Sequence, residues 1–407
     1  MKNICIIAGE ASGDMHGALL VKALQNELNA SKFWGIAGPL MREAGVEAFI
    51  QTDNLAVFGI SELLSQYFLI SRCYKQIRYE ISKRKPDAVI FIDYPGFNLR
   101  LIQDVYALGI TTIYHIPPKA WSHGANRASI LRDAAYLVTS ILPFEIPFFK
   151  AKGVSISFVG NPIKDAVKEY LEQHKITSSE TARVKYRIGL LPGSRANEIK
   201  KLLPILIEAF IKLHQKIDKV TGMIPIAPTL DPNFVKEIAY KAAHASGVTT
   251  EWLNKHVSFG MGNAYEVMSS SHYAWVCSGT ASLETAFFNT PQSVVYKVSP
   301  LTAYVARKIV VVKYVSLVNL IANKEVVPEF LQERATAANL VEHAYNMLTS
   351  AKAGPEMTAQ FQHIAAKFPP HAAQNAAKEI LECIKTYDLP FSEKFKYQNW
   401  KKTKGTT

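Results

Sequence analysis

The strongest chemical signal in the chain is a run of small and polar residues that directly follows the apolar segment 273–277: Ser278, Gly279, Thr280, Ala281, Ser282 and Glu284. A buried strand, a small-residue turn and the start of a helix would bring several free backbone N–H groups to one point. The positive end of the helix dipole lies there too, so the turn favours a phosphate or diphosphate. Glu284 is expected on the first helical turn, where its carboxylate can accept hydrogen bonds from ribose hydroxyls. The combination indicates a nucleotide-sugar site.

The same residues also admit a purely structural interpretation. Small residues at a strand-to-helix turn often serve close packing, and a Glu in the first turn is favoured by the helix dipole alone. A capping box would need Ser or Thr three residues before the Glu, and that residue is Ala281. Capping is therefore the weaker explanation, but packing and ligand binding both remain open at this point.

A second glycine-containing turn, residues 9–14, follows the apolar run 4–8. It lacks the G-x-G-x-x-G fingerprint, which disfavours a nicotinamide cofactor. Its glycines still allow a ligand to approach the backbone closely. Capping would need only Ser12 or Asp14, and the turn carries Glu10 as well. We assign Ser12, Gly13 and Asp14 to an acceptor-binding loop.

A single carboxylate, Asp93, follows the apolar run 88–92 and precedes a Pro-Gly turn. At the edge of a buried strand it would be partly desolvated, which raises the pKa of a carboxyl group and suits a general base. The alternative is that Asp93 only binds neighbouring backbone N–H groups. We favour the general base, because the position faces the expected ligand edge of the sheet.

An arginine follows the first strand of the second half, in the run Gly193-Ser194-Arg195. A planar, permanently charged guanidinium suits a diphosphate leaving group, although an exposed loop arginine is the simpler interpretation of this residue alone. We place Gly193, Ser194, Arg195 and Met261 in the donor-binding set. No D-x-D and no metal-ligand spacing occurs, so we predict a metal-independent protein without a cofactor, in which Arg195 and the turn at Gly279 neutralise the leaving group.

The bulk properties are those of a two-domain globular protein. The chain has 407 residues, of which 48% are hydrophobic and 20% are charged. Its four cysteines are far apart, which predicts buried free thiols in a reducing cytoplasm. We expect neither a signal peptide at the N-terminus nor a membrane span in residues 304–322, which contain three basic residues. The net charge of +12 favours phosphate-bearing partners.

Short apolar runs alternate with amphipathic stretches, which is typical of parallel α/β structure. The sequence predicts two Rossmann-like parallel-sheet domains facing each other across a cleft, at residues 1–170 and 171–345. Residues 164–187 are interpreted as the connection between them. Residues 346–407 form a helical and then basic tail, expected to cross back to an N-terminal domain. The predicted strands are 4–8, 88–93, 111–116, 136–141, 155–160, 188–191, 222–226, 273–277 and 293–298.

Taken together and in this order, the motifs resemble the lipid-A-disaccharide synthase family over residues 3–345. The matching segments are residues 9–14, 35–39, 56–60, 92–98, 142–145, 191–195, 278–284 and 314–320. The resemblance implies a GT-B fold and an inverting transfer that joins UDP-2,3-diacylglucosamine to 2,3-diacylglucosamine 1-phosphate. The products would be a β-1,6-linked disaccharide 1-phosphate and UDP.

The resemblance also implies roles for individual residues. Asp93 and Arg195 correspond to an essential aspartate and an essential arginine of the family. Asn319 matches an asparagine needed for activity and joins the donor-binding set. Glu10 matches a polar residue of the N-terminal site. We expect Asp93 to be the base, with Glu10 as its rival.

The chain departs from the family pattern near the expected acceptor site. A family segment that usually reads Ser-Pro-Ser-Val-Trp-Ala-Trp is Pro-Pro-Lys-Ala-Trp-Ser-His here, at residues 117–123. Lys119 is expected to add a phosphate contact, and His123 replaces an aromatic residue. Asn161 stands where His is common, and Tyr94 and Gly96 alter the turn after Asp93. These changes affect the expected acceptor contacts and leave the donor motifs intact.

An apolar patch bordered by cations suggests shallow insertion at an anionic inner-membrane surface, with the protein cytoplasmic and peripheral. A core-facing helix with a solvated basic end is an equally good interpretation. The basic tail could assist membrane binding, and a homodimer is a further possibility. The patch comprises Phe58, Leu63, Leu64, Tyr67, Phe68 and Leu69, followed by six Lys or Arg residues between 72 and 85.

Two other function classes stay open from the sequence. One is another GT-B enzyme acting on UDP-GlcNAc, either a lipid II-type glycosyltransferase or an epimerase. The other is a non-enzymatic module that binds anionic membranes. A nucleic-acid partner is disfavoured, because the basic residues lack interleaved aromatic residues and no nucleic-acid motif is visible.

Overall fold

The computed structural model describes residues 2–28, 31–52, 63–122, 124, 126–174, 185–299 and 313–387, without the side chains of residues 63–67. The chain divides into two compact units. The first unit comprises Met1–Pro162 and Pro369–Thr407, and the second comprises Ile163–Phe368. The boundary expected at residue 170 is therefore corrected, because it falls inside helix α8 (Pro162–Gln173).

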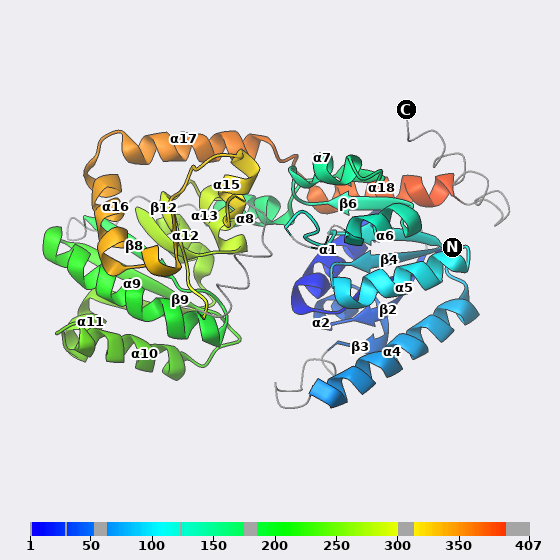
Figure 1. Cartoon of the computed structure of the whole chain (residues 1–407), viewed down its shortest axis with the longest axis horizontal. Coiled ribbons are helices and arrows are strands. Elements are labelled where there is room, and N and C mark those ends of the chain that lie inside the picture. Colours follow the sequence, from blue (N-terminus) through cyan, green and yellow to red (C-terminus); the bar gives the residue numbers. More distant parts are fainter. Residues whose placement is uncertain are drawn as a thin grey trace. The chain divides into compact units, whose positions relative to one another are not determined.

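The first unit is built on a seven-stranded parallel sheet in the order β3-β2-β1-β4-β5-β6-β7 (Figure 1). The order changes direction between β1 and β4, and loops that follow such neighbouring strands form the usual ligand site of an open α/β sheet. Glu10 follows β1 and Asp93 follows β4. The strands are β1 (Lys2–Ala8), β2 (Ser31–Ala37), β3 (Glu47–Gln51), β4 (Ala88–Ile92), β5 (Thr111–His115), β6 (Leu137–Ser140) and β7 (Ile156–Phe158).

Helices cover both faces of this sheet, and each face forms its own apolar cluster with the helices packed on it. One cluster includes α1 and the C-terminal helix α18, which pack against each other. The other includes α4 and α5. The helices are α1 (Ala11–Glu27), α2 (Pro39–Glu43), α4 (Leu63–Arg84), α5 (Pro95–Ala107), α6 (Asn126–Ala134), α7 (Glu145–Lys150) and α18 (Ala372–Thr386).

The second unit has a six-stranded parallel sheet in the order β10-β9-β8-β11-β12-β13. Its order changes direction between β8 and β11, so the loops at Gly193 and Gly279 lie at the corresponding position. The strands are β8 (Tyr186–Leu191), β9 (Val220–Ile226), β10 (Val257–Met261), β11 (Tyr273–Cys277), β12 (Gln292–Tyr296) and β13 (Glu329–Leu331).

The remaining helices belong to the second unit and surround its sheet (Figure 1). They include α16 and α17, which contact each other and pack on α9 and α13. The single tail expected at 346–407 is therefore corrected: α17 belongs to the second unit, and α18 to the first. The helices are α9 (Ala196–Lys216), α10 (Pro232–Ala245), α11 (Thr250–His256), α12 (Ala264–Ser270), α13 (Thr280–Phe287), α15 (Leu317–Ala322), α16 (Ala337–Thr349) and α17 (Ala353–Ala366).

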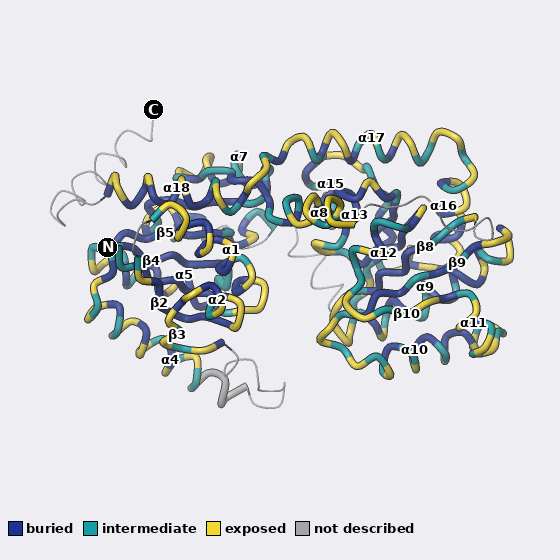
Figure 2. The backbone as a smooth tube through the Cα atoms, turned by 180° about the vertical axis from the view of Figure 1, so that it is seen from behind, coloured by how far each residue is buried: buried dark blue, intermediate teal, exposed yellow. Residues whose placement is uncertain are grey.

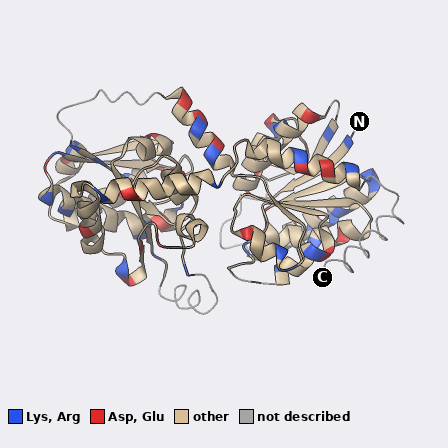
Figure 3. Cartoon of the chain, turned by 90° about the horizontal axis from the view of Figure 1, so that it is seen from above, with Lys and Arg blue, Asp and Glu red and all other residues tan. Residues whose placement is uncertain are grey.

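All nine predicted strands are present, because parallel strands covered on both faces read as continuous apolar runs. Figure 2 shows that the strands are mostly buried, and Figure 3 shows that the charged residues lie mainly on the helices. Four further strands, β2, β3, β10 and β13, were not predicted. β3 alternates exposed and half-buried residues, and β13 has only three residues. The connection expected at 164–187 is corrected at its start, because residues 164–173 are helical.

Candidate active site

Asp93 lies on a strained turn that its neighbours hold in place. Asp93 and Tyr94 have φ angles of 44° and 48°, in the left-handed region that costs a non-glycine residue roughly 1–3 kcal/mol. The carbonyl of Asp93 accepts hydrogen bonds from the Tyr114 hydroxyl at 2.6 Å and from Asn98 Nδ2 at 2.8 Å. Its amide donates to the carbonyl of His115 at 3.1 Å. The turn therefore presents the carboxylate of Asp93 in a defined orientation.

The surroundings of Asp93 raise the pKa of its carboxyl group overall. Burial raises the pKa of the Asp93 carboxyl, and the negative charge of Glu10 raises it further. A hydrogen bond from the Tyr94 amide and the positive charge of Lys119 act in the opposite direction. The prediction that Asp93 is partly desolvated is confirmed. Glu10 and Lys119, both exposed, lie close enough to Asp93 to influence its protonation.

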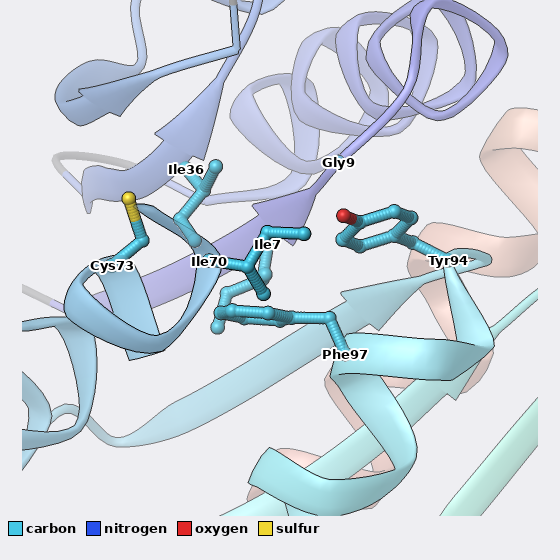
Figure 4. Close-up of a pocket in the computed structure, with 7 residues that line it drawn as sticks. All are labelled: Ile7, Gly9, Ile36, Ile70, Cys73, Tyr94 and Phe97. Atoms are coloured by element: carbon cyan, nitrogen blue, oxygen red, sulfur yellow. The ribbon is translucent and has the colours of Figure 1, made fainter. Parts of the chain in front are cut away.

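An apolar pocket lies directly behind this turn. It is lined by Ile7, Gly9, Ile36, Ile70, Cys73, Tyr94 and Phe97. Figure 4 shows the Tyr94 ring beside the backbone of Gly9, with Cys73 on the other side of the pocket. Because a side chain at position 9 would overlap the Tyr94 ring, the glycine is required for this packing. The pocket lies between the Asp93–Tyr94 turn and helix α4.

The acceptor-binding loop expected at residues 12–14 is corrected at Asp14. This carboxylate is 3% exposed. It accepts hydrogen bonds from the amides of Gly38 at 2.9 Å, Leu40 at 2.9 Å and Met41 at 3.0 Å. Asp14 therefore satisfies the free N–H groups at the start of α2 and has a structural role. Gly13 is also buried, whereas Ser12 is exposed at the start of α1.

Sequence reasoning missed a second carboxyl group near Asp93, that of Glu145. Glu145 is 3% exposed, and it accepts hydrogen bonds from Trp121 Nε1 at 2.9 Å and from the Ser140 hydroxyl. Burial raises its pKa to about 7, while Ser140, Trp121 and Lys119 act in the opposite direction. The sequence signal that could have revealed it is a single Glu within the apolar stretch 141–149.

In the second unit, the turn after β11 has open space beside Gly279. Gly279 is exposed and has a φ of 147°, and no atom lies within 4 Å of the position that its Cβ would occupy. Thr280 is exposed at the first position of α13, and Ser278 and Ala281 are half-buried. Ser282 is corrected: it is fully buried, and its hydroxyl donates to the Gly279 carbonyl at 2.9 Å. Ser282 thus stabilises the turn from inside.

Glu284 is the fifth residue of α13, so it lies just beyond the first turn, and the expectation of a first-turn position is wrong. Its carboxyl is half-buried and forms a hydrogen bond with the Tyr265 hydroxyl. Burial raises the pKa of Glu284, and the bond from Tyr265 partly offsets that rise. The Tyr265 hydroxyl shows that this carboxyl group is placed to accept hydrogen bonds from hydroxyl groups.

The Arg195 loop is organised by Glu198 near the start of α9. One carboxylate oxygen of Glu198 accepts from the amides of Ser194 at 3.0 Å and Arg195 at 3.2 Å. The other oxygen accepts from Arg195 Nη1 at 3.0 Å. The Arg195 side chain remains 81% exposed, so a ligand can reach its guanidinium. Gly193 has a φ of 107°, and Met261 is 50% exposed at the end of β10.

The expectation that Asn319 contacts the donor is corrected. Asn319 is completely buried, and its Oδ1 accepts from the amides of Val326 and Val327. Its Nδ2 donates to the Val327 carbonyl at 2.8 Å and to Glu329 Oε1 at 2.9 Å. Glu329 in turn accepts from the amide of Val315, whose carbonyl accepts a bond from the Ser278 hydroxyl at 3.5 Å. Asn319 therefore stabilises the loop that contains Ser278 indirectly, through Glu329 and Val315.

The expected membrane patch is only partly visible. Phe58 lies outside the described residues, as do the side chains of Leu63, Leu64 and Tyr67. Phe68 is 71% exposed on α4, and Leu69 is half-buried. Within the described ranges, no helix is both long enough and apolar enough to cross a membrane. In the same ranges, no group of three or more His, Cys, Asp or Glu residues could hold a metal ion.

Comparisons with known proteins identify the family. A family model described as lipid-A-disaccharide synthetase matches residues 4–381. The lipid-A-disaccharide synthase of Nitrosococcus oceani is 33% identical over 387 residues, covering 95% of this chain and 97% of that protein. The enzyme of the same name from Geobacter sulfurreducens is 36% identical over 335 residues, covering 82% and 84%.

Similar solved structures agree on the fold. The UDP-GlcNAc 2-epimerase of Neisseria meningitidis, solved with UDP-GlcNAc, has a TM-score of 0.62 at 12% identity and covers 95% of this chain and 100% of its own. The kitacinnamycin glycotransferase has a TM-score of 0.60 at 12% identity, covering 94% and 99%. These likenesses support the GT-B fold and nothing finer. The family match, which spans both units and every donor motif, shows that the chain belongs to the lipid-A-disaccharide synthetase family of glycosyltransferases.

Proposed function

We propose that Asp93 is the general base of the transfer that this family performs. The 6-hydroxyl of 2,3-diacylglucosamine 1-phosphate attacks the anomeric carbon of UDP-2,3-diacylglucosamine. Asp93 takes the hydroxyl proton, the β-1,6 bond forms, and UDP leaves with the electron pair of the broken bond. The observation that carries this role is the held, partly buried carboxylate on the strained turn after β4. A raised pKa makes a carboxylate a stronger base.

Glu10 is the weaker candidate for the base. It is exposed at the start of α1 and makes no capping bond to the helix. Its charge raises the pKa of Asp93, so it can tune the base without taking the proton itself. Asp93→Asn should reduce kcat at least about a thousandfold, whereas Glu10→Gln should reduce it about tenfold. The opposite order would exchange the two roles, and Asp133→Asn is a matched surface control.

We assign the UDP moiety to the turn after β11 and to Arg195. The backbone N–H groups at the exposed residues Gly279 and Thr280 and the accessible guanidinium would share the diphosphate, since both can donate to its oxygens. Glu284 is suited to the ribose hydroxyls, which would replace or join its Tyr265 partner. Met261, exposed at the end of β10, is assigned to the nucleoside end.

We assign the phosphate of the acceptor to Lys119. This side chain is exposed and interacts electrostatically with Asp93, so a phosphate bound to it would lie near the base. Lys119→Met should raise the KM for the acceptor and leave the KM for the donor unchanged. Equal changes in both KM values would reject this assignment.

The assay that tests the whole function uses the purified full chain with both acylated substrates and no added metal. UDP release that requires both substrates is the expected result. An epimerase would instead convert a UDP-sugar without any acceptor. A non-enzymatic module would release no UDP with either substrate combination.

Peripheral membrane binding through α4 is a further part of the proposal. This helix exposes Phe68, Ile70 and Tyr79 together with Arg72 and Lys75. Apolar side chains beside cations suit an anionic bilayer surface. Phe68→Ser should reduce cosedimentation with vesicles that contain phosphatidylglycerol, whereas Tyr345→Ser in the second unit should not. Unchanged binding of the Phe68 variant would reject α4 as the contact.

A further inference from the structure

We propose that Glu145 is a positioning residue for acceptor binding: its hydrogen bond to Trp121 holds the loop that presents Lys119 beside Asp93. This inference rests on the proposed roles of Asp93 and Lys119. Glu145 would contact neither substrate. Its effect would pass through the loop formed by residues 117–122, which follows β5.

The carboxyl group of Glu145 links three separate segments of the first unit. Glu145 is the first residue of α7, and the buried Ser140 at the end of β6 donates its hydroxyl hydrogen bond to it. The Ser140 hydroxyl oxygen also accepts from the Leu142 amide at 3.0 Å, which fixes the chain between β6 and α7. The second carboxyl oxygen accepts from Trp121 Nε1 at 2.9 Å. The carboxyl group is thus held by the sheet and reaches outward to the loop.

The loop is anchored on both sides of Lys119. Pro117 and Pro118 precede it and are buried. The ring of each proline fixes its backbone φ angle, which restricts the conformation of the loop. Ala120 follows it and is 4% exposed. The Trp121 ring packs edge-on against Phe144, with 4.9 Å between the ring centroids. Lys119 is therefore the exposed residue between buried neighbours.

Lys119 interacts electrostatically with both carboxyl groups. Its charge acts on Asp93 and on Glu145, and Asp93 and Glu145 also act on each other. A buried carboxyl group without partners is costly, so Glu145 needs the hydrogen bonds that it receives from the loop and the sheet. The bond to Trp121 also holds the loop from which the exposed Lys119 side chain projects. If Glu145 served only to stabilise the start of α7, it would not need the hydrogen bond from Trp121.

The test separates positioning from stability by a double-mutant cycle. Trp121→Phe keeps a smaller aromatic ring beside Phe144 and removes the indole N–H, so it should raise the acceptor KM about tenfold with the donor KM unchanged. Glu145→Gln keeps an oxygen acceptor for Trp121 and should cause a smaller rise of about threefold. In a Lys119→Met background, Trp121→Phe should have no further effect on acceptor KM. Trp252→Phe on α11 is the matched control and should leave both KM values unchanged.

Three results would overturn the inference. The first is an unchanged acceptor KM in Trp121→Phe. The second is an equal rise in both KM values that follows the loss of Tm. The third is a full tenfold effect of Trp121→Phe in the Lys119→Met background. If Asp93→Asn or Lys119→Met itself behaves as wild type, the proposed function has failed. If Asp93→Asn lowers kcat and Lys119→Met raises the acceptor KM, but Trp121→Phe leaves the acceptor KM unchanged, the inference alone is wrong.

Discussion

The ring of Tyr94 lies against the backbone of Gly9, so the loop after β1 and the loop after β4 pack directly on each other. Tyr94 follows Asp93, and Gly9 precedes Glu10. The positions of Asp93 and Glu10 therefore depend on one contact that tolerates no side chain at position 9. This contact also forms one wall of the apolar pocket behind the turn.

Gly9→Ala should displace the Tyr94 ring and, with it, the carboxylate of Asp93. We expect kcat to fall at least about tenfold, because small misplacements of a catalytic group are costly. Steady-state kinetics of the purified variant check this. Gly9→Ala combined with Tyr94→Ala should recover part of the loss, since the overlapping ring is removed. A double variant as slow as the single one would show that the contact does not position Asp93.

The acidic limb of the pH profile should depend on Glu10. Burial and the Glu10 charge raise the pKa of Asp93, so the base becomes protonated and inactive at a higher pH than an ordinary Asp. Glu10→Gln removes one raising charge and should shift the acidic limb of kcat/KM to lower pH. Lys119→Met removes a lowering charge and should shift it to higher pH. Shifts in the same direction for both variants would contradict this electrostatic arrangement.

Stability should depend on pH through Glu145. Its folded-state pKa is about 7 and the ordinary value is 4.5, so between these values the folded state binds more protons than the unfolded state. The free energy of unfolding must then fall as pH rises through this window, by up to about 3 kcal/mol. Glu145→Gln removes this contribution. Urea unfolding at pH 5 and pH 8 should show a smaller decrease for the variant than for the wild type.

Arg195→Ala should weaken UDP binding without lowering stability. The guanidinium is exposed and pairs with Glu198, and such exposed pairs contribute little to folding. Loss of its contact to the diphosphate should raise the Kd for UDP by about ten- to a hundredfold in calorimetry. Arg132→Ala is the matched control, because Arg132 also forms an exposed ion pair in the first unit. An unchanged Kd would remove Arg195 from the donor site.

Asn319→Ala should act mainly on stability. The substitution removes the acceptor of the Val326 and Val327 amides and one of the donors to the Glu329 carboxylate. We expect a loss of about 2–4 kcal/mol in the free energy of unfolding. UDP affinity should weaken only as far as the 314–316 segment shifts. A large loss of affinity at unchanged stability would indicate direct contact instead.

The sequence by itself determined nine of the parallel strands and the loops that follow them. Buried parallel strands such as 88–92 and 273–277 read as unbroken apolar runs, and their carboxyl ends form the functional edge of each sheet. Asp93 and Gly279 were therefore predicted at strand ends, where the structure has them. The glycine and proline turns next to them were visible for the same local reason.

Only the tertiary structure decided which polar residues are available to a ligand. The carboxylate of Asp14 accepts hydrogen bonds from amides 24 to 27 residues away. The side-chain amide of Asn319 is hydrogen-bonded to the segment that leads into β13. Glu145 receives its bond from Trp121, 24 residues before it. Such partners meet only when the sheet is assembled, so no local pattern distinguishes a buried, satisfied side chain from one that faces a substrate.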